Sequence, residues 1–414
     1  MPDITNKFGT IAIIGTGLIG GSLALALKEK GAVSCIVGCS RNIETLNEAK
    51  GLGIIDEGFT DPADAVSGAD IIVLCTPLSS YHNIITRCIP NLSPEVIITD
   101  VGSVKDRPSQ DIIDALPSCH HPFFVPGHPI AGTEKSGPNA AFSSLYHDKN
   151  IILTPLKYTH ENALEKVTQM WQIVGAEVEN ISPTRHDFIY ASVSHIVQLV
   201  SSCYGLLISR HGSKDQGKVI GSADVDFIKF IRLCGSDPVM WRDIFSSNSH
   251  NIEIILRNFS DNLKSIIQHV EQGLQDVLAY RLERARDKRQ AFQIASGVGN
   301  IQHSLPCENS KGHNCNVLMD MVPRLIACLI MEGVAASEYG HATGAGLHGL
   351  SRNLLLENGA RADDILANKK EILQYLNSLS MMLDVFYKEL EKGDSGAIEQ
   401  LLSEARATYL EIIK

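Results

Sequence analysis

The chain has 414 residues, of which 44% are hydrophobic and 20% charged, and its formal net charge is −11. This length exceeds what one hydrophobic core usually organises, so two or three domains are expected. The acidic balance argues against nucleic acid or an anionic membrane surface as a partner, because both attract basic patches.

Membrane-spanning segments, signal peptides and paired cysteines indicate where a protein resides. No apolar run approaches the roughly 20 residues of a membrane span, and the polar start from Met1 to Lys7 does not resemble a signal peptide. The ten cysteines are scattered without a Cys-x-x-Cys pair, as in proteins whose thiols stay reduced. We therefore expect a soluble, cytoplasmic protein.

The first motif is a glycine-rich loop between a predicted strand and a predicted helix. The β-branched run Thr10 to Ile14 leads into Gly-Thr-Gly-Leu-Ile-Gly, and an alanine- and leucine-rich stretch follows as far as Lys30. This order is typical of dinucleotide-binding folds, in which backbone N–H groups at the helix start hold the pyrophosphate. The predicted cofactor-binding residues of this loop are Gly15, Gly17, Leu18, Ile19 and Gly20.

The end of the second predicted strand bears on the choice of cofactor. Val33 to Cys39 is followed by Ser40 and Arg41, and no Asp or Glu occupies positions 38–42. NAD-preferring folds place an acidic residue about 20 residues after the glycines, on the ribose 2′-hydroxyl. Ser40 and Arg41 would instead suit a 2′-phosphate, which favours NADP, whereas a solvated Arg41 would leave NAD open.

Further α/β units follow. Residues 69–76 and 96–100 are continuous apolar runs of the kind found in buried parallel strands. Thr76 and Pro77 end the first run and are predicted to lie near the cofactor. Ser103 follows the second run at a strand-to-helix turn, where a hydroxyl either caps the helix or faces a site. Residues 150–154 and 177–181 are predicted to be late strands of the same sheet.

A polar loop at residues 127–137 follows an apolar run at 122–125 and is the richest stretch in chemistry-bearing groups. It contains an imidazole, a carboxylate, an ammonium and two hydroxyls, with three glycines that let backbone approach a ligand. Open α/β sheets keep their chemistry in loops at strand ends. The candidate site residues here are His128, Thr133 and Glu134.

From about residue 184 the pattern becomes helical. An apolar helix over 183–209 carries His195, which is either a core residue or a site residue. Arg232 lies in an apolar setting before a helix start at Asp237, and a buried guanidinium needs an anion. That anion is either Asp243 or a substrate carboxylate. Residues 248–289 are predicted to form one or two long amphipathic helices.

The loop at 127–137, together with the segments 100–105 and 232–243, resembles the prephenate/arogenate dehydrogenase family of tyrosine biosynthesis over residues 8–290. The resemblance implies an α/β Rossmann-type dinucleotide-binding domain followed by an all-α domain that dimerises. It also implies an oxidative decarboxylation. A hydride leaves C4 of the cyclohexadienol ring for the nicotinamide, and the ring carboxylate departs as CO₂.

The resemblance assigns roles to several residues. His128 would accept a hydrogen bond or the proton from the 4-hydroxyl group, and Ser103 would orient the histidine or the hydroxyl. Arg232 would hold a substrate carboxylate through its guanidinium fork. Three further residues would line or gate the pocket: His195, Thr133 and Glu134.

The chain departs from the family at one position. Many members have Ser-His-x-x-His, whereas this chain has Ser194-His195-Ile196-Val197-Gln198. Gln198 is thereby predicted to contact the substrate side chain. An amide both donates and accepts hydrogen bonds, so the keto group of prephenate and the amino group of arogenate are both compatible with it.

The resemblance leaves the last part of the chain unexplained. Residues 295–316 form a polar linker whose two histidines and two cysteines match no common zinc spacing, so a linker is favoured over a metal site.

A shift of 120 residues pairs ten identical residues between 248–286 and 368–406. A repeat of residues 200–290 is expected here, with similar leucine spacing in unrelated amphipathic helices as the alternative.

These patterns predict four segments. They are a dinucleotide-binding domain at 1–183, a helical substrate and dimerisation domain at 184–294, the linker at 295–316 and a second helical domain at 317–414. The second copy would replace a partner subunit and form an internal pseudo-dimer. A homodimer through the helical domains and a separate regulatory domain that senses tyrosine are the alternatives.

Two other functions are alternatives to this one. A β-hydroxyacid or 6-phosphogluconate-type dehydrogenase would need a catalytic lysine on the first long helix of the second domain, and no lysine lies between Val167 and Ser213. A non-catalytic regulator that binds NADP would have no use for His128 or Arg232.

Overall fold

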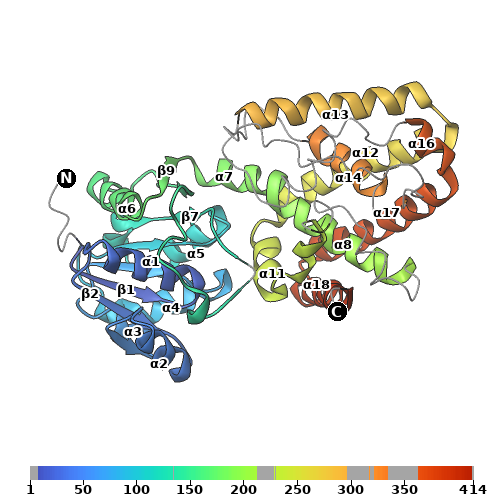
Figure 1. Cartoon of the computed structure of the whole chain (residues 1–414). Coiled ribbons are helices and arrows are strands. Elements are labelled where there is room, and N and C mark those ends of the chain that lie inside the picture. The colour runs from blue at the N-terminus through green and yellow to red at the C-terminus, as the bar shows by residue number, and fades with distance from the viewer. Residues whose placement is uncertain are drawn as a thin grey trace. The chain divides into compact units, whose positions relative to one another are not determined.

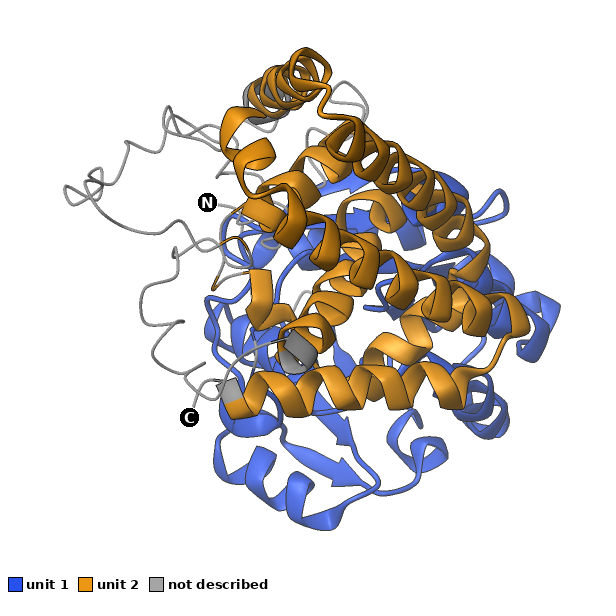
Figure 2. Ribbon diagram, turned by 90° about the vertical axis from the view of Figure 1, so that its right-hand side faces the viewer, with its two compact units in different colours: residues 1–187 blue, residues 188–414 orange. Residues whose placement is uncertain are grey.

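The computed structural model describes residues 8–133, 135–211, 228, 230–295, 317, 321–333 and 362–412. The chain forms two compact units, residues 1–187 and 188–414, shown in blue and orange in Figure 2. The described residues beyond 317 fall within the second unit. Glu134 and residues 296–316 of the predicted linker at 295–316, with its candidate metal ligands, lie outside the described residues.

Unit 1 is built on a six-stranded parallel sheet in the order β3-β2-β1-β4-β5-β6. Figure 1 labels β1 and β2 of this sheet. The strand order reverses between β1 and β4, so the carboxyl ends of these two strands border the position where open α/β sheets bind ligands. The strands are β1 (Thr10–Ile14), β2 (Cys35–Cys39), β3 (Glu57–Phe59), β4 (Ile71–Leu74), β5 (Ile97–Asp100) and β6 (Phe124–Val125).

The helices of unit 1 pack on this sheet around an aliphatic and aromatic core. The indole of Trp171 is fully buried and meets the ring of Tyr146 edge-on, with ring centroids 5.0 Å apart. The helices are α1 (Leu18–Glu29), α2 (Ile43–Gly51), α3 (Pro62–Ala65), α4 (Tyr81–Cys88), α5 (Asp106–Ala115) and α6 (Glu161–Ile173), with 3-10 turns at Leu78–Ser80, Ile89–Asn91, Ser118–Phe123 and Pro138–Ala140.

A second, three-stranded sheet corrects one expectation. It contains β7 (Gly127–Pro129), β8 (Asn150–Leu153) and β9 (Glu177–Asn180) in that order. The prediction that the last two belong to the main sheet was wrong, because β8 pairs antiparallel with β7 and parallel with β9. The pairing with β8 holds β7, the strand that carries His128.

The apolar helix predicted over 183–209 consists of α7 (Pro183–Tyr190), a π-helical turn (Ala191–His195) and α8 (Ile196–His211). The stretch Pro183–Ile208 is long and apolar enough to cross a membrane, which corrects the expectation that no run approaches that length. However, 94% of an apolar 18-residue stretch within this helix is buried in the protein, as expected of a core helix.

Unit 2 is helical throughout its described part. Helix α11 begins where the Asp237 carboxylate accepts a hydrogen bond from the Met240 N–H and Pro238 occupies the first turn. Besides α8, the elements are a 3-10 turn (Arg232–Gly235), α11 (Pro238–Ser247), α12 (Ser249–Gln272), α13 (Gln275–Ala295), α14 (Val322–Gly333), α16 (Ala362–Ala367), α17 (Lys369–Lys392) and α18 (Ser395–Ile412).

Helices α12 and α17 have matching lengths and ends. Both contain 24 residues, and their bounds differ by the same 120 residues as the sequence shift. Asn248 and Asn368 precede them, and Gly273 and Gly393 end them with φ of 70° and 69°, a left-handed conformation that glycine adopts readily. The paired residues Ile252 and Ile372, Leu256 and Leu376, and Leu263 and Leu383 are all fully buried.

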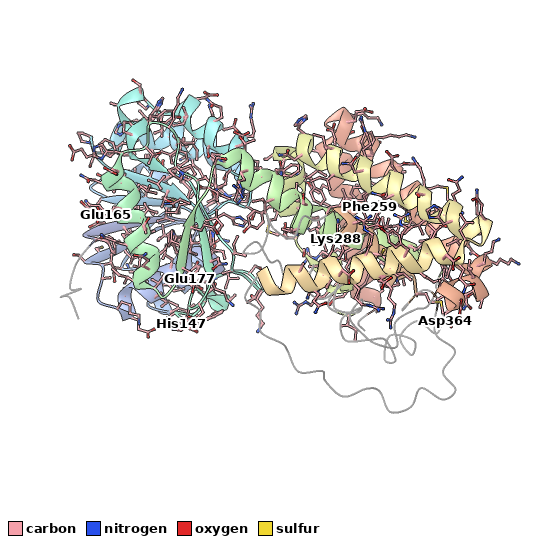
Figure 3. The ribbon with its side chains drawn as sticks, turned by 90° about the horizontal axis from the view of Figure 1, so that it is seen from above. His147, Glu165, Glu177, Phe259, Lys288 and Asp364 are labelled. Carbon is pink, nitrogen blue, oxygen red and sulfur yellow. The ribbon has the colours of Figure 1, made fainter. Side chains whose placement is uncertain are left out.

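Helix α14 packs on α13 and α12 within unit 2. Lys288 on α13 donates a hydrogen bond from Nζ to the carbonyl oxygen of Glu332 at the end of α14, at 2.7 Å. Arg281 on α13 donates from Nε to the Glu332 carboxylate at 2.8 Å. Phe259 of α12, labelled with Lys288 in Figure 3, is 5% exposed. A cation at a helix C-terminus is favourable, so these contacts stabilise the end of α14.

Candidate active site

The glycine loop has the shape that a dinucleotide needs. A Cβ atom on Gly15 (φ +106°) would lie 2.5 Å from the Cys75 carbonyl oxygen, and one on Gly20 would lie 2.3 Å from the Gly15 carbonyl oxygen. Nothing lies within 4 Å of a Cβ atom on Gly17. The loop is therefore closed at its two ends and open at Gly17. Helix α1 starts here without a side-chain cap or an acidic first turn, which suits an anion.

The ends of β2 and β4 carry the other predicted cofactor residues. Ser40 is half-buried, and its hydroxyl accepts a hydrogen bond from the Asn42 N–H at 3.4 Å. Arg41 is exposed and forms no ion pair with any described residue. Thr76 Oγ1 accepts a hydrogen bond from Ser80 at 2.8 Å, and Pro77 is exposed. Asn42 caps α2 by accepting the N–H groups of Glu44 and Thr45, and Arg41 precedes it at an exposed position.

A buried ion pair joins the end of β5 to the start of β7. Asp100 accepts hydrogen bonds from Lys105 Nζ at 2.5 Å and from the hydroxyl of Tyr81 at 3.1 Å. It also accepts the N–H groups of Gly102 and Gly127, at 2.9 and 3.1 Å. Lys105 donates in addition to the Gly127 carbonyl at 2.5 Å. Burial lowers the pKa of Lys105, and the charge of Asp100 opposes that shift.

His128 stands at one end of a buried row of side chains. It is 9% exposed, and its Nδ1 lies 2.8 Å from Nε2 of His186. Nδ1 of His186 lies 2.7 Å from Oδ1 of Asp187. The Asp187 carboxylate also accepts the backbone N–H groups of Lys105 and Asp106, each at 2.8 Å. Burial lowers the pKa of His186 well below its usual value, and the charge of Lys105 adds to this, so His186 is neutral near pH 7.

Ser103 and Thr133 are the other predicted site residues that the structure describes in unit 1. Ser103 is half-buried, and the first turn of α5 is capped by Asp187. Of the two roles considered for Ser103, the structure therefore does not support capping. Thr133 is exposed, and its hydroxyl accepts a hydrogen bond from the Lys135 N–H at 3.2 Å.

In unit 2, His195 lies in the interior at the end of the π-helical turn. It is 1% exposed, its Nδ1 lies 3.2 Å from Nδ2 of Asn248, and its ring meets Trp241 at 80° with centroids 6.0 Å apart. Asn248 in turn accepts a hydrogen bond from Asn251 at 2.8 Å. These contacts fix the ring, as is required both of a core histidine and of one that lines a site.

Gln198 is 2% exposed, and its Nε2 donates to the carbonyl oxygen of Leu233 at 2.9 Å. A carbonyl oxygen requires a donor, so this contact fixes which way the amide points. The other amide atom, Oε1, is buried without a hydrogen-bond partner in the described part of the chain.

Arg232 is exposed, which corrects the expectation that it is buried. It begins the 3-10 turn that ends at Gly235. The described residues contain no ion pair between Arg232 and Asp243, and Asp243 accepts hydrogen bonds from Arg242 at 2.9 and 2.5 Å. Arg242 also bonds Glu399 of α18 at 2.6 Å.

Comparisons with known proteins cover most of the chain. Residues 23–180 match the profile of the prephenate dehydrogenase nucleotide-binding domain, and residues 182–284 match that of the prephenate dehydrogenase dimerization domain. The cyclohexadienyl dehydrogenase of Zymomonas mobilis is 30% identical over 286 residues, which are 69% of this chain and 97% of that protein. The chain belongs to the prephenate dehydrogenase family.

Solved structures of relatives agree with this. Prephenate dehydrogenase from Aquifex aeolicus, in complex with hydroxyphenyl propionate and NAD⁺, is 34% identical with a TM-score of 0.61. The match covers 68% of this chain and 97% of that one. Synechocystis arogenate dehydrogenase is 28% identical with a TM-score of 0.57, over 68% and 99% of the two chains. The predicted family, fold class and NAD(P)-dependent dehydrogenase activity are confirmed.

The sequence reasoning missed two residues that this prephenate dehydrogenase-family chain places beside His128. His186 and Asp187 were counted only as part of an apolar helix. A signal was present, because a buried helix seldom begins with a histidine and a carboxylate side by side unless both have partners. Lys105 and Asp100 were part of the predicted segment 100–105, but their ion pair was not predicted.

Proposed function

We propose that the protein catalyses the NAD(P)⁺-dependent oxidative decarboxylation of prephenate or arogenate, with His128 as the group that receives the proton of the substrate hydroxyl. The observation that carries this proposal is the buried His128, backed by His186 and Asp187, in a chain of this family. A neutral imidazole is a suitable proton acceptor near pH 7.

The residues around the glycine loop fit the cofactor. Gly17 leaves room for a pyrophosphate, and the uncapped start of α1 offers N–H groups to it. When bound, the nicotinamide supplies the acceptor for the hydride. The chain's own residues bind the substrate and move the proton: His128 takes it from the hydroxyl, Ser103 orients that hydroxyl, and Arg232 holds a carboxylate. His195, Thr133 and Glu134 are proposed as further substrate-binding residues.

We propose NADP as the preferred cofactor. Arg41 is exposed at the end of β2 and has no carboxylate partner among the described residues, while Ser40 places a hydroxyl beside it. A phosphate would gain charge-assisted hydrogen bonds from this arginine. NAD would gain no equivalent contact, because no acidic residue stands at positions 38–42 to bind a ribose 2′-hydroxyl.

For the substrate, the orientation of Gln198 favours arogenate. Its amide nitrogen donates to the Leu233 carbonyl at 2.9 Å and to the Ser202 hydroxyl at 3.5 Å, and Oε1 remains as a buried acceptor. The ammonium group of arogenate donates hydrogen bonds, whereas the keto oxygen of prephenate only accepts them. A buried acceptor without a donor costs roughly 1–3 kcal/mol, so a substrate that supplies the donor is favoured.

We further propose that the second helical copy replaces a partner subunit. Under the 120-residue shift α8, α11, α12 and α13 correspond to α14, α16, α17 and α18. Helix α12 packs on α17, α11 on α18 and α13 on α16, while α8 packs on α18 and α14 on α13. Each contact is thus matched by its reciprocal, which is the pattern of a two-fold interface between identical surfaces.

Sedimentation equilibrium of the full chain tests this internal pseudo-dimer. We expect a monomer near 45.1 kDa, since α17 already covers the face of α12 that would pair with another subunit. A larger species formed through other surfaces would be unaffected by changes on α12. A stable dimer that dissociates when Leu256 or Leu263 is replaced by Ala would contradict the proposal.

The catalytic proposal is tested by initial rates of NAD(P)H formation from prephenate and from arogenate, each with NAD⁺ and with NADP⁺. We expect turnover with at least one pair and the highest kcat/KM with arogenate and NADP⁺. The matched control is His128→Gln, which keeps a polar group but cannot take the proton. Absence of turnover in all four pairs, with cofactor binding intact, would overturn the assignment and favour a non-catalytic regulator.

A further inference from the structure

The contacts behind His128 determine more than its position, because each hydrogen bond in the row has a direction. Asp187 Oδ1 is a carboxylate oxygen that already accepts the N–H of Lys105 and lies 2.7 Å from Nδ1 of His186. A carboxylate only accepts hydrogen bonds, so Nδ1 of His186 must carry the proton. In a neutral imidazole, Nε2 of His186 then carries the lone pair.

The same reasoning extends to the next ring. Nε2 of His186 lies 2.8 Å from Nδ1 of His128, and two lone pairs cannot face each other at that distance. Nδ1 of His128 must therefore be the protonated nitrogen, which leaves its lone pair on Nε2. This is the nitrogen that can accept a proton.

From this geometry, and on the basis of the proposed function, we infer that His186 and Asp187 are positioning residues that hold His128 in its reactive tautomer. Asp187 fixes which nitrogen of His186 carries the proton, and His186 in turn fixes the tautomer of His128. His128 then presents the lone pair of Nε2 to the substrate hydroxyl. Neither His186 nor Asp187 needs to touch the substrate for this.

The anchor of the row is rigid. Both oxygens of Asp187 are bonded at the start of α5, Oδ1 to the Lys105 N–H and Oδ2 to the Asp106 N–H. A helix N-terminus favours an anion, and the side chain of Asp187 is only 2% exposed. The carboxylate therefore cannot turn away, and it cannot present a donor. The lowered pKa of His186 agrees with a neutral ring that accepts rather than a charged ring that donates.

The row also favours the proton transfer itself. When His128 becomes an imidazolium, its Nδ1–H bond to His186 strengthens, and the negative charge of Asp187 lies at the far end of the row. Charge developed in a buried setting is stabilised by prearranged dipoles and charges. Replacing His186 should accordingly lower kcat more than it changes KM, since the residues that bind the substrate would be unchanged.

The inference is tested with three variants of the full-length protein. His186→Gln places an amide oxygen near the former Nε2 and can still accept from His128. His186→Leu has similar bulk and cannot accept. His147→Gln is the control, because His147 (Figure 3) is in unit 1 with a side chain 67% exposed. Nitrogen-15 NMR of labelled histidines, assigned with His128→Gln, reports which ring nitrogen of His128 carries the proton.

We expect wild-type His128 to be protonated at Nδ1, and the Gln variant to keep this tautomer. In the Leu variant, Nε2–H should appear, and kcat should fall by about 100-fold, the scale of general-base catalysis. The Gln variant should recover at least about a tenth of the wild-type kcat. Cofactor binding and thermal unfolding, measured on each variant, show that the fold is intact.

Two outcomes would overturn the inference. One is a wild-type His128 protonated mainly at Nε2, and the other is a Leu variant that keeps both the Nδ1–H tautomer and the wild-type kcat. Failure of the proposed function gives a different result. The wild type would then turn over neither substrate, while the NMR spectra would still report the tautomer of His128 and its dependence on His186.

Discussion

Replacement of Lys105 by Met probes the ion pair that supports the candidate site. The Lys105 side chain is fully buried and that of Asp100 is 2% exposed. Methionine fills a similar volume but leaves the Asp100 carboxylate buried without its cation. Removing one partner of a buried pair costs about 3–5 kcal/mol. We expect about 3 kcal/mol, the lower end, because Tyr81 and the N–H groups of Gly102 and Gly127 still donate to the carboxylate.

Unit 1 has 187 residues, a size at which 1 kcal/mol shifts the melting temperature by about 2–4 °C. The melting temperature of unit 1 should therefore fall by roughly 6–12 °C. The chain has two tryptophans, Trp171 in unit 1 and Trp241 in unit 2. In a Trp241→Phe background, fluorescence reports the unfolding of unit 1 alone, and calorimetry gives the enthalpy.

The double variant Lys105→Met with Asp100→Asn is the decisive comparison. It removes both charges, so its loss of unfolding free energy should be smaller than the sum of the two single losses by about 2 kcal/mol, a coupling typical of residues in direct contact. Lys166→Met, at an exposed position of α6, is the matched control. A Lys105→Met loss no larger than that of the control, or strictly additive losses in the double variant, would refute the reasoning.

Three further predictions concern the cofactor, the substrate and pH. Arg41→Gln should lower kcat/KM for NADP⁺ by about 10- to 100-fold, the value of a charge-assisted hydrogen bond, and hardly change that for NAD⁺; an equal loss with both would contradict the 2′-phosphate role. Gln198→His should raise the kcat/KM ratio of prephenate to arogenate by about tenfold, and an unchanged ratio would count against Gln198 as the selective residue. Because the folded-state pKa of His186 lies below its unfolded value, its stabilising contribution is present above pH 6.5 and is lost as the pH falls, by up to about 1.4 kcal/mol per pH unit. Urea unfolding between pH 7 and 5 should show a smaller loss in His186→Gln than in the wild type, and identical slopes would refute this.

Local features could be predicted from the sequence because neighbouring residues decide them. Strand β1 has the predicted bounds, since a β-branched run stops at a glycine whose φ of +106° excludes other side chains. The start of α11 follows from Asp237 and Pro238, and the ends of α12 and α17 follow from Gly273 and Gly393. The loop around His128, together with the segments 100–105 and 232–243, was sufficient to indicate the family.

Tertiary structure alone decided what surrounds those motifs. His186 lies 58 residues after His128 in the chain, and their contact exists because β7 pairs with β8 and α7 begins beside the start of α5. The exposure of Arg232 and the ion pair of Arg242 with Glu399 of α18 depend likewise on helix packing. Residue patterns fix backbone conformation over a few residues, whereas burial and hydrogen-bond partners depend on which distant segments the hydrophobic core brings together. The sequence therefore predicted His128 as a site residue, but it could not predict which of the two ring nitrogens carries the proton.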